Sequence, residues 1–263
     1  MSLSFWNGRF LPEAEVRIPP DDAGFLFGDG LFETLRVDAG QAGDVEAHLD
    51  RLLAGLARIG IEIPEDRDAL EAAIAEVAEA APWPTARLRV TVTRSPTRLV
   101  TAAPYQPPGD RVSVLLLSDL RIDSQGPLAG LKSLCYQMNR LALRRAEAAG
   151  AWEALLLNER GRLVEGARSN LALALPDGVF TPPLEDGCLP GTVRRRLLEQ
   201  GTIAERSLSL EDLERAGGIY LLNSLVGILK VGEVNGRPVP VGRPLDRFTG
   251  PEPRRAPRRP PPA

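Results

Sequence analysis

Apolar and polar positions in the first half of the chain follow both the strand period and the helix period. Residues Leu31 to Val37 alternate between apolar and polar, which is typical of a half-buried strand. Asn7-Gly8 lies between two apolar runs and predicts a hairpin turn. Together these patterns predict an α+β domain with an antiparallel sheet. In order, its remaining elements are a helix at Val45 to Ile59, a helix at Asp66 to Ala81, and strands at Ala86 to Thr93 and Arg111 to Leu117.

The segment SDLRIDSQGPLAG interrupts the pattern and is interpreted as a link between two halves. We therefore predict an N-terminal α+β domain at residues 1–120, a linker at 121–129 and a C-terminal domain at 130–248. Residues 249–263, rich in proline and arginine, are expected to be a disordered tail. In the second half, helices are predicted at Tyr136 to Ala149 and Thr192 to Gln200, and strands at Glu153 to Asn158, Leu163 to Glu165, Ser169 to Leu175, Val179-Phe180, Ile203 to Arg206, Ile219 to Asn223 and Leu229 to Val234, with a hairpin turn at Asn235-Gly236.

Composition narrows the class of protein. A net charge of −3 over 263 residues does not suggest a nucleic-acid or membrane partner, and no apolar run approaches the roughly 20 residues of a membrane span. With one histidine and two cysteines, a metal site is not expected. Cys135 and Cys188 are too few for a disulfide framework. We expect two buried, reduced thiols in a cytoplasmic protein.

Lys132 is the first candidate for chemistry, in the stretch GLKSLCYQMN. It lies just ahead of the helix predicted from Tyr136, at the boundary between the two halves. Small-molecule sites are often built between domains. The position alone therefore makes Lys132 a candidate site residue.

Other polar positions indicate a binding site only when they are considered together. The glycines of GFLFGDGLFETLR do not form a phosphate loop, because the element that follows them is a strand and such a loop needs a helix N-terminus. Arg51 lies among leucines on its helix and can point sideways toward a cleft. The helix after Gly191 offers free backbone N–H groups to a phosphate. Glu165 adds a carboxylate, and Asn223-Ser224 is a polar pair at the end of an apolar strand.

Four segments follow one another along the chain: HLDRL, LKSLCYQMNRLALRRAEAAGAWEALLLNERGRLVEG, LPGTVR and LLNSL. Together they resemble the fold type IV pyridoxal-phosphate enzymes, that is, class IV aminotransferases and aminodeoxychorismate lyase. The resemblance runs from about Asn7 to about Arg237, and FGDGLFETLR with Asn223-Ser224-Leu225 is more similar to the lyase. It implies a two-domain fold of mixed α+β/α/β class, with an antiparallel-sheet N-terminal domain carrying two helices and a barrel-like C-terminal cofactor domain.

The resemblance also implies roles for the residues that match. Lys132 would hold pyridoxal 5′-phosphate as a Schiff base and move protons on the substrate. Glu165 would pair with the pyridine nitrogen of the cofactor, and Tyr136 would reach the ring hydroxyl. The cofactor phosphate would be bound by Arg51, by the backbone N–H groups of Thr192 and Val193, and by the side chains of Thr192 and Asn223.

The substrate side departs from the family pattern. TRSPTRLVTAAP replaces the usual glycine-rich loop but retains two arginines, and Arg168 stands where a small hydroxyl residue is usual. Substrate carboxylates would be held by an arginine at these positions. Solvated surface arginines remain an equal alternative. The substrate-binding candidates are Thr34, Arg94, Arg98 and Arg168.

The function implied is a homodimeric lyase of folate biosynthesis. It would convert 4-amino-4-deoxychorismate to 4-aminobenzoate and pyruvate. A D-amino-acid or branched-chain aminotransferase uses the same lysine, glutamate and phosphate site and is the alternative. A protein that binds pyridoxal phosphate without turnover is the alternative from another class.

Overall fold

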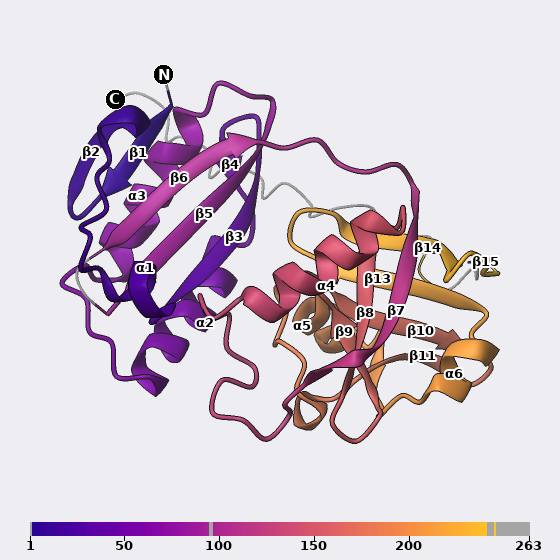
Figure 1. Cartoon of the computed structure of the whole chain (residues 1–263). Helices are drawn as coiled ribbons and strands as arrows, with labels where there is room; N and C mark the ends of the chain where they lie inside the picture. The colour runs from indigo at the N-terminus through magenta and orange to yellow at the C-terminus, as the bar shows by residue number, and fades with distance from the viewer. Residues whose placement is uncertain (1, 95–96, 241–244, 246–263) are drawn as a thin grey trace.

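Two β-sheets lying side by side organise the chain in the computed structural model (Figure 1), which describes residues 2–94, 97–240 and 245. The tail expected at 249–263 lies outside the described residues. The strands of the first sheet are β1 (Leu3–Trp6), β2 (Arg9–Pro12), β3 (Gly30–Asp38), β4 (Gln41–Ala42), β5 (Thr85–Thr93) and β6 (Arg98–Pro104).

The first sheet is antiparallel throughout, in the order β2-β1-β6-β5-β3-β4. The hairpin predicted at Asn7-Gly8 joins β1 to β2, and both residues have the positive φ that this turn requires. Strand β6 is an addition to the prediction, because the sequence pattern favours a loop there.

Two helices, α2 (Val45–Arg58) and α3 (Arg67–Glu79), pack on one face of this sheet and begin and end close to their predicted bounds. Alternate residues of β3 and β5 point into the core between sheet and helices, as period two demands. A short helix, α1 (Ala23–Phe27), is capped by the buried carboxylate of Asp22, which accepts a hydrogen bond from the Phe25 amide at 3.0 Å. The core side chains shared by these elements include Leu31, Leu35, Val37, Leu49, Leu52, Leu56, Leu70, Ile74, Leu88 and Val90.

The second sheet closes on itself. Strands β10, β13, β14, β7, β8 and β9 form a ring, which the pairing of Asn170 in β10 with Glu165 in β9 completes. Strands β11, β12 and β15 extend it outside the ring. The bounds are β7 (Arg111–Ile122), β8 (Glu153–Asn158), β9 (Leu163–Gly166), β10 (Asn170–Leu175), β11 (Gly178–Thr181), β12 (Ala204–Glu205), β13 (Gly218–Asn223), β14 (Gly227–Val234) and β15 (Arg237–Pro238).

Strand β7 corrects the sequence-based assignment of residues 111–117 to the first sheet. It pairs in parallel with β14 and with β8, so it belongs to the barrel. The apolar pattern of a strand predicts which of its residues are buried but not which strands it pairs with. Pairing with the strand that is nearest in sequence is common but not required. We therefore propose that the boundary between the two domains lies at residues 105–110, ahead of β7, rather than at 121–129.

Three helices accompany the barrel: α4 (Gln137–Ala148), α5 (Thr192–Glu199) and α6 (Leu210–Arg215). Helix α4 lies against β7 and β8, and α5 packs against β13. Helix α6 is not predicted by the pattern but starts with a capping box, in which Ser209 and Asp212 bond each other's backbone. No helix within the described ranges is long and apolar enough to cross a membrane. Single 3-10 turns occupy Glu13–Glu15 and Leu184–Asp186.

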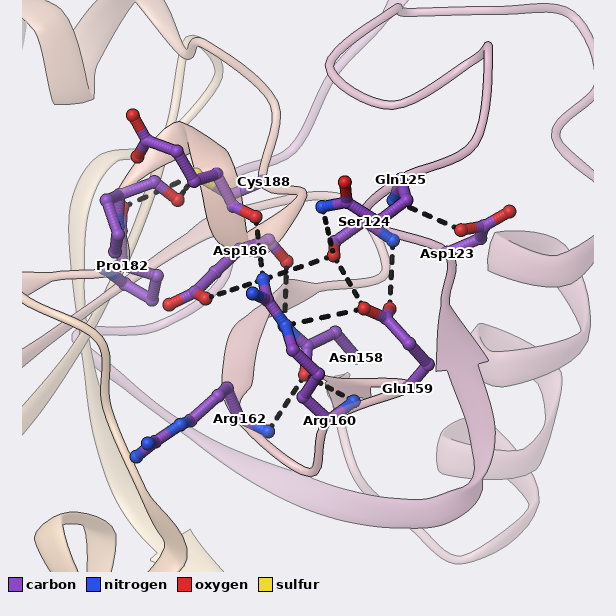
Figure 2. Close-up of polar contacts among 12 residues, drawn as sticks. Asp123, Ser124, Gln125, Asn158, Glu159, Arg160, Arg162, Pro182, Asp186 and Cys188 are labelled. Atoms are coloured by element: carbon purple, nitrogen blue, oxygen red, sulfur yellow. Dashed lines mark hydrogen bonds and ion pairs between the residues drawn. The ribbon is translucent and has the colours of Figure 1, made fainter.

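A polar network at one end of the barrel fixes the segment that leads into α5 (Figure 2). Asn158, fully buried at the end of β8, accepts hydrogen bonds from the backbone of Arg160 and Arg162 and donates to the carbonyl of Asp186 at 3.1 Å. Arg160 also reaches the Asp186 carboxylate at 3.1 Å, and Glu159 holds Ser124 by its amide and hydroxyl. The turn after β8 is thereby tied both to Ser124, just after β7, and to the segment before α5.

Candidate active site

Lys132 lies on a segment that is hydrogen-bonded to the first sheet although it belongs to the second half of the chain. The Lys132 carbonyl accepts from the Phe32 amide at 3.0 Å, and the Leu134 amide donates to Gly30 at 2.9 Å. Leu31 and Ser133 form an antiparallel bridge between these two bonds. The segment 132–134 is thus held as a short extra strand beside β3, which fixes the lysine between the two halves.

The Lys132 amine is held close to an aromatic ring and to a second cation. Its Nζ lies 4.5 Å from the centre of the Phe32 ring. Burial, and then the charge of Arg51, lowers the pKa of Lys132 to about 8, against the opposing effect of Glu33 and Glu165. An amine with that pKa is partly neutral near physiological pH, which suits a nucleophile or base.

A cavity of about 400 Å³ opens beside this amine. Its walls come from β3 and one face of α2 on one side, and from residues 130–132 and 190–195 on the other. Arg51, Lys132 and Thr192, three of the residues singled out from the sequence, line it together. The volume is within the range of small-molecule sites.

Arg51 is fixed in this cavity by three hydrogen bonds. Its Nε and Nη2 donate to the two carboxylate oxygens of Glu33, at 2.8 and 2.6 Å, and its Nη1 donates to the Pro190 carbonyl at 2.9 Å. A guanidinium has five N–H donors, so two remain for a ligand. This is the donor geometry that binds a phosphate or a carboxylate.

The N-terminus of α5 adds backbone donors to the same cavity. Gly191 is its N-cap, and no side chain caps the first turn, which contains Thr192 and Val193. A Cβ at Gly191 would overlap the side-chain oxygen of Asn170, so a larger residue does not fit there. Open N–H groups and the helix dipole make this end an anion site.

Glu165 is held at the point where the barrel closes. Its Oε2 accepts from the Leu189 amide at 2.9 Å and from Asn170 Nδ2 at 3.2 Å. Burial raises the pKa of Glu165 to about 7, although the Leu189 N–H and Lys132 act in the opposite direction. A cation placed against this carboxylate would be stabilised by it.

Tyr136 and Asn139, at the start of α4, both donate to the Ala167 carbonyl, at 2.6 and 3.0 Å. The Tyr136 ring meets Phe32 edge to face at 5.3 Å. Burial, followed by the charge of Glu165, raises the pKa of Tyr136, so the hydroxyl stays protonated. The phenol therefore keeps the proton that it donates to the Ala167 carbonyl.

Asn223 and Thr34 lie where the two sheets touch. The Asn223 carbonyl oxygen accepts from the amides of Leu225 and Val226, at 2.9 and 3.0 Å, so the side chain stabilises the turn between β13 and β14. Ser224 of this turn donates to the Thr34 carbonyl at 2.7 Å. The structure thus gives both residues a part in the sheet contact, and neither lines the cavity.

The three arginines predicted to bind substrate carboxylate are not brought to the cavity. Arg94 pairs with Asp29 at 2.5 Å. Arg98 begins strand β6 instead of lying in a loop, and it pairs with Glu65 at 2.8 Å. Arg168 stacks on the Trp152 ring at 4.1 Å and donates to the Trp152 carbonyl. A strand in place of the expected loop explains why Arg98 points elsewhere.

Arg89 is a cation that the sequence-based reasoning missed. Its guanidinium lies 3.8 Å from the centre of the Phe32 ring, the same ring that contacts Lys132. Among the residues that the structure describes, no carboxylate pairs with it; its Nε donates to Thr91 at 3.1 Å. Burial, and then the charge of Arg87, lowers the pKa of Arg89 to about 10. The strand alternation of β5, with leucine and valines on the opposite face, is the sequence signal for it.

The two cysteines correct another expectation. Both are free thiols, but Cys135 is exposed and only Cys188 is buried. Burial raises the pKa of Cys188 to about 12, so its sulfur is inert at neutral pH. Cys135 follows the Lys132 segment out to the surface.

Comparisons with known proteins identify the family of this chain. The bifunctional aminodeoxychorismate lyase / D-amino acid transaminase of Mycobacterium tuberculosis is 30% identical over 266 residues, covering 89% of this chain and 91% of that protein. The crystal structure of 4-amino-4-deoxychorismate lyase from Pseudomonas aeruginosa superposes with a TM-score of 0.80 at 32% identity, over 92% of this chain and 94% of that one.

A hypothetical aminotransferase from Mycobacterium tuberculosis, in its PLP-bound form, superposes with a TM-score of 0.82 at 27% identity, over 91% of this chain and 93% of that chain. The family described as Amino-transferase class IV matches residues 30–234. The chain therefore belongs to the class IV aminotransferase family, whose cofactor is pyridoxal phosphate.

Proposed function

We propose that Lys132 carries the cofactor and that Arg51, the N-terminus of α5 and Glu165 hold its two ends. The donor set supports this assignment, because an amine with a lowered pKa lines the same cavity as Arg51 and Thr192 and interacts electrostatically with the buried carboxylate of Glu165. Two open N–H groups of Arg51 and the uncapped N–H groups of Thr192 and Val193 suit a phosphate. The residues present therefore fit pyridoxal phosphate.

When bound, the cofactor supplies an aldehyde that condenses with amines and a ring that accepts the electrons of a breaking bond. Lys132 is then the base. Its amine, with a pKa of about 8, takes the proton from the substrate carbon that bears the amine. Glu165 stabilises positive charge at the ring nitrogen, because its carboxylate is buried and has few other donors.

The reaction we propose is the conversion of 4-amino-4-deoxychorismate to 4-aminobenzoate and pyruvate. After Lys132 removes the proton, the enolpyruvyl group leaves the neighbouring carbon, the ring becomes aromatic, and protonation of the departing group gives pyruvate. The observation that carries the substrate assignment is Arg89, a half-buried cation beside Phe32 with no carboxylate partner among the described residues. A substrate carboxylate would supply the missing counter-charge.

Aminotransfer is the second candidate, and a specific observation favours keeping it. The relative from Mycobacterium tuberculosis is named for both lyase and D-amino acid transaminase activities. Both reactions use the same base, carboxylate and phosphate site, so the protein's own residues serve either. A protein that binds the cofactor without turnover is the third candidate.

Product analysis separates these candidates. The purified holoenzyme is incubated with aminodeoxychorismate, and separately with D-alanine or a branched-chain amino acid plus 2-oxoglutarate. Formation of 4-aminobenzoate in the first mixture is expected. Transfer of the amino group to the keto acid, without formation of 4-aminobenzoate, would identify an aminotransferase instead of a lyase. Absence of product in both mixtures would indicate a protein that binds the cofactor without turnover.

The anchoring lysine is tested independently of turnover. The chain contains only two lysines, Lys132 and Lys230. Borohydride reduction of the loaded protein followed by peptide mass spectrometry should find the cofactor on the Lys132 peptide. Modification of the Lys230 peptide instead would overturn the proposed site.

Arg89→Gln tests the substrate contact. Loss of one charge-assisted hydrogen bond from a half-buried site should raise KM for aminodeoxychorismate by about tenfold or more, with cofactor binding unchanged. Arg98→Gln is the matched control, because that arginine is paired with Glu65 away from the cavity. Equal effects of the two substitutions on KM would refute the role of Arg89.

A homodimer in the cytoplasm, serving folate biosynthesis, completes the proposal. Phe25 and Phe27 on α1 are 72% and 74% exposed and provide apolar surface that a second copy would cover. Light scattering on the purified protein, compared with the double variant Phe25→Ser/Phe27→Ser, measures the oligomeric state. A monomeric wild type would refute the homodimer.

A further inference from the structure

A carboxylate interrupts the apolar face of β3. Residues Leu31, Leu35 and Val37 of this face pack in the core, and Glu33 lies among them with 1% of its side chain exposed. A buried charge is expensive unless it is paired and hydrogen-bonded. Glu33 is both, since it bonds the guanidinium of Arg51 with its two oxygens.

His48 is the third member of this cluster. Its Nδ1 lies 2.7 Å from Oε2 of Glu33, and its side chain is also 1% exposed. His48 and Arg51 are three residues apart on α2, so both face β3 from the same side of the helix. Glu33 thus receives donors from two side chains of one helix.

The ring of His48 has a single polar partner. Among the described residues, its Nε2 is buried without a hydrogen bond. Burial lowers the pKa of His48, so the ring is neutral and Nδ1 carries the proton that it donates to Glu33. Burial alone would raise the pKa of Glu33, but the Arg51 charge and these hydrogen bonds lower it to about 2.

An unpaired buried ring nitrogen destabilises the fold relative to an apolar residue of similar size. A leucine would fill this position without that cost, as Leu49 and Leu52 do at neighbouring positions of α2. The imidazole is therefore explained at this position by the hydrogen bond that it donates to Glu33.

We propose that His48 is a positioning residue for the cofactor phosphate, acting through Glu33 on Arg51. This inference rests on the proposed role of Arg51 as a phosphate ligand. His48 fixes the Glu33 carboxylate, and the carboxylate takes the Nε–Nη2 edge of the guanidinium. With Nη1 also bonded to Pro190, the two remaining N–H groups have one fixed direction.

Fixing the guanidinium in advance favours binding, because an arginine that must be ordered by its ligand loses side-chain entropy at that moment. The effect is specific for the phosphate. A ligand that lacks phosphate does not use the open N–H groups of Arg51. Pyridoxal, the dephosphorylated cofactor, is therefore the internal reference for the experiment.

Two neutral substitutions isolate the hydrogen bond without changing the charge of the site. His48→Leu fills the space but removes the donor. His48→Asn places an amide N–H close to where Nδ1 stood and restores it. The full-length chain, freed of cofactor by dialysis, is titrated with pyridoxal phosphate and with pyridoxal, and binding is followed by visible absorbance.

For His48→Leu, we expect the dissociation constant of pyridoxal phosphate to rise about tenfold, the size of one hydrogen bond to a charged group. The dissociation constant of pyridoxal should stay unchanged, and His48→Asn should bind both ligands like wild type. Equal weakening of both ligands in His48→Leu would reduce the residue to a structural role. Unchanged binding of pyridoxal phosphate would also overturn the proposal.

Two further variants keep the result interpretable. Arg51→Gln tests the role of Arg51 itself: if it does not weaken pyridoxal phosphate relative to pyridoxal, the phosphate assignment fails before His48 is considered. If Arg51→Gln shows the loss and His48→Leu does not, only the inference about His48 fails. Glu65→Gln breaks the comparable pair with Arg98 outside the cavity, so it should lower thermal stability and leave both ligand affinities unchanged.

Discussion

Replacing Lys132 by methionine should stabilise the cofactor-free protein, and the gain should depend on pH. Methionine keeps the length of the side chain and removes the charge. The wild-type amine is placed beside a second cation, Arg51, in a site that lowers its pKa from 10.5 to about 8. The protonated amine is therefore less stable in the folded protein than in the unfolded chain. The methionine variant lacks this unfavourable contribution to the free energy of folding.

The sign follows from proton binding. An unfolded chain keeps this amine protonated up to its ordinary pKa of 10.5, whereas the folded protein releases the proton near 8. Between these values the unfolded state binds more protons, so the free energy of unfolding of wild type rises with pH. Below pH 8 the wild type bears the full cost.

The size of this stability difference follows from the same two pKa values of Lys132. A fall from 10.5 to about 8 corresponds to about 3 kcal/mol for an amine cut off from solvent. Lys132 is half-buried at the wall of a cavity, and water there screens part of the effect. We therefore expect the stability advantage of Lys132→Met to shrink by about 2 kcal/mol as pH rises from below 8 to 10.5.

Urea denaturation of both proteins across this pH range measures the difference. Groups other than Lys132 titrate in both proteins, so their contributions cancel in the comparison. Lys230→Met is the matched control, because it removes the other lysine of the chain from a strand that does not line the cavity. A stability difference for Lys132→Met that stays flat with pH, or only matches Lys230→Met, would refute the reasoning.

Three further substitutions test how the site is supported. Gly191→Ala should weaken pyridoxal phosphate about tenfold in an absorbance titration, because the new methyl group displaces Asn170 from its hydrogen bonds; wild-type affinity would contradict this. Asn158→Ala should lower the free energy of unfolding by about 2 kcal/mol in urea, since the buried hydrogen bond to the Asp186 carbonyl before α5 and the bonds to the backbone of Arg160 and Arg162 are lost. Tyr136→Phe should reduce kcat with little change in stability, and an unchanged kcat would remove the phenol from the reaction.

Local patterns predicted most elements, because helices and half-buried strands bury one face and the buried barrel strands are continuous apolar runs. The helix expected at Val45 to Ile59 is observed as α2 (Val45–Arg58), and the strand expected at Glu153 to Asn158 is observed with the same bounds. Strand β6 was missed, since Ser-Pro and threonine suggest a loop and its register is set by β5. The partners of β7 were missed for the same reason, because a parallel pairing is decided by the closed barrel and not by the strand itself.

The substrate side shows why residue type alone is a poor guide to a site. Arg94 and Arg98 were attractive because they flank an irregular stretch, but each finds a carboxylate on its own domain. Arg89 looked like an ordinary polar position of a strand. Only the tertiary structure reveals that it lies over the ring that also touches Lys132 and that no described carboxylate pairs with it.

Strand β3 explains how one short segment serves two chemically different ends of the site. Successive residues of a strand point to opposite faces. Glu33 points toward α2 and holds Arg51, the proposed phosphate ligand, while Phe32 points the other way and contacts Lys132 and Arg89. The backbone of the same strand binds the lysine segment through the Phe32 amide.

This arrangement couples the positions of the residues proposed as phosphate ligand, base and substrate-binding cation. A one-residue shift in the register of β3 against β5 would exchange the two faces. It would place Phe32 against α2 and turn Glu33 to the face of Lys132, where the carboxylate, which already opposes the lowering of the pKa of the amine, would raise it further. The nine-residue pairing of β3 with β5, from Gly30↔Thr93 to Asp38↔Thr85, therefore fixes the face on which each proposed site residue lies.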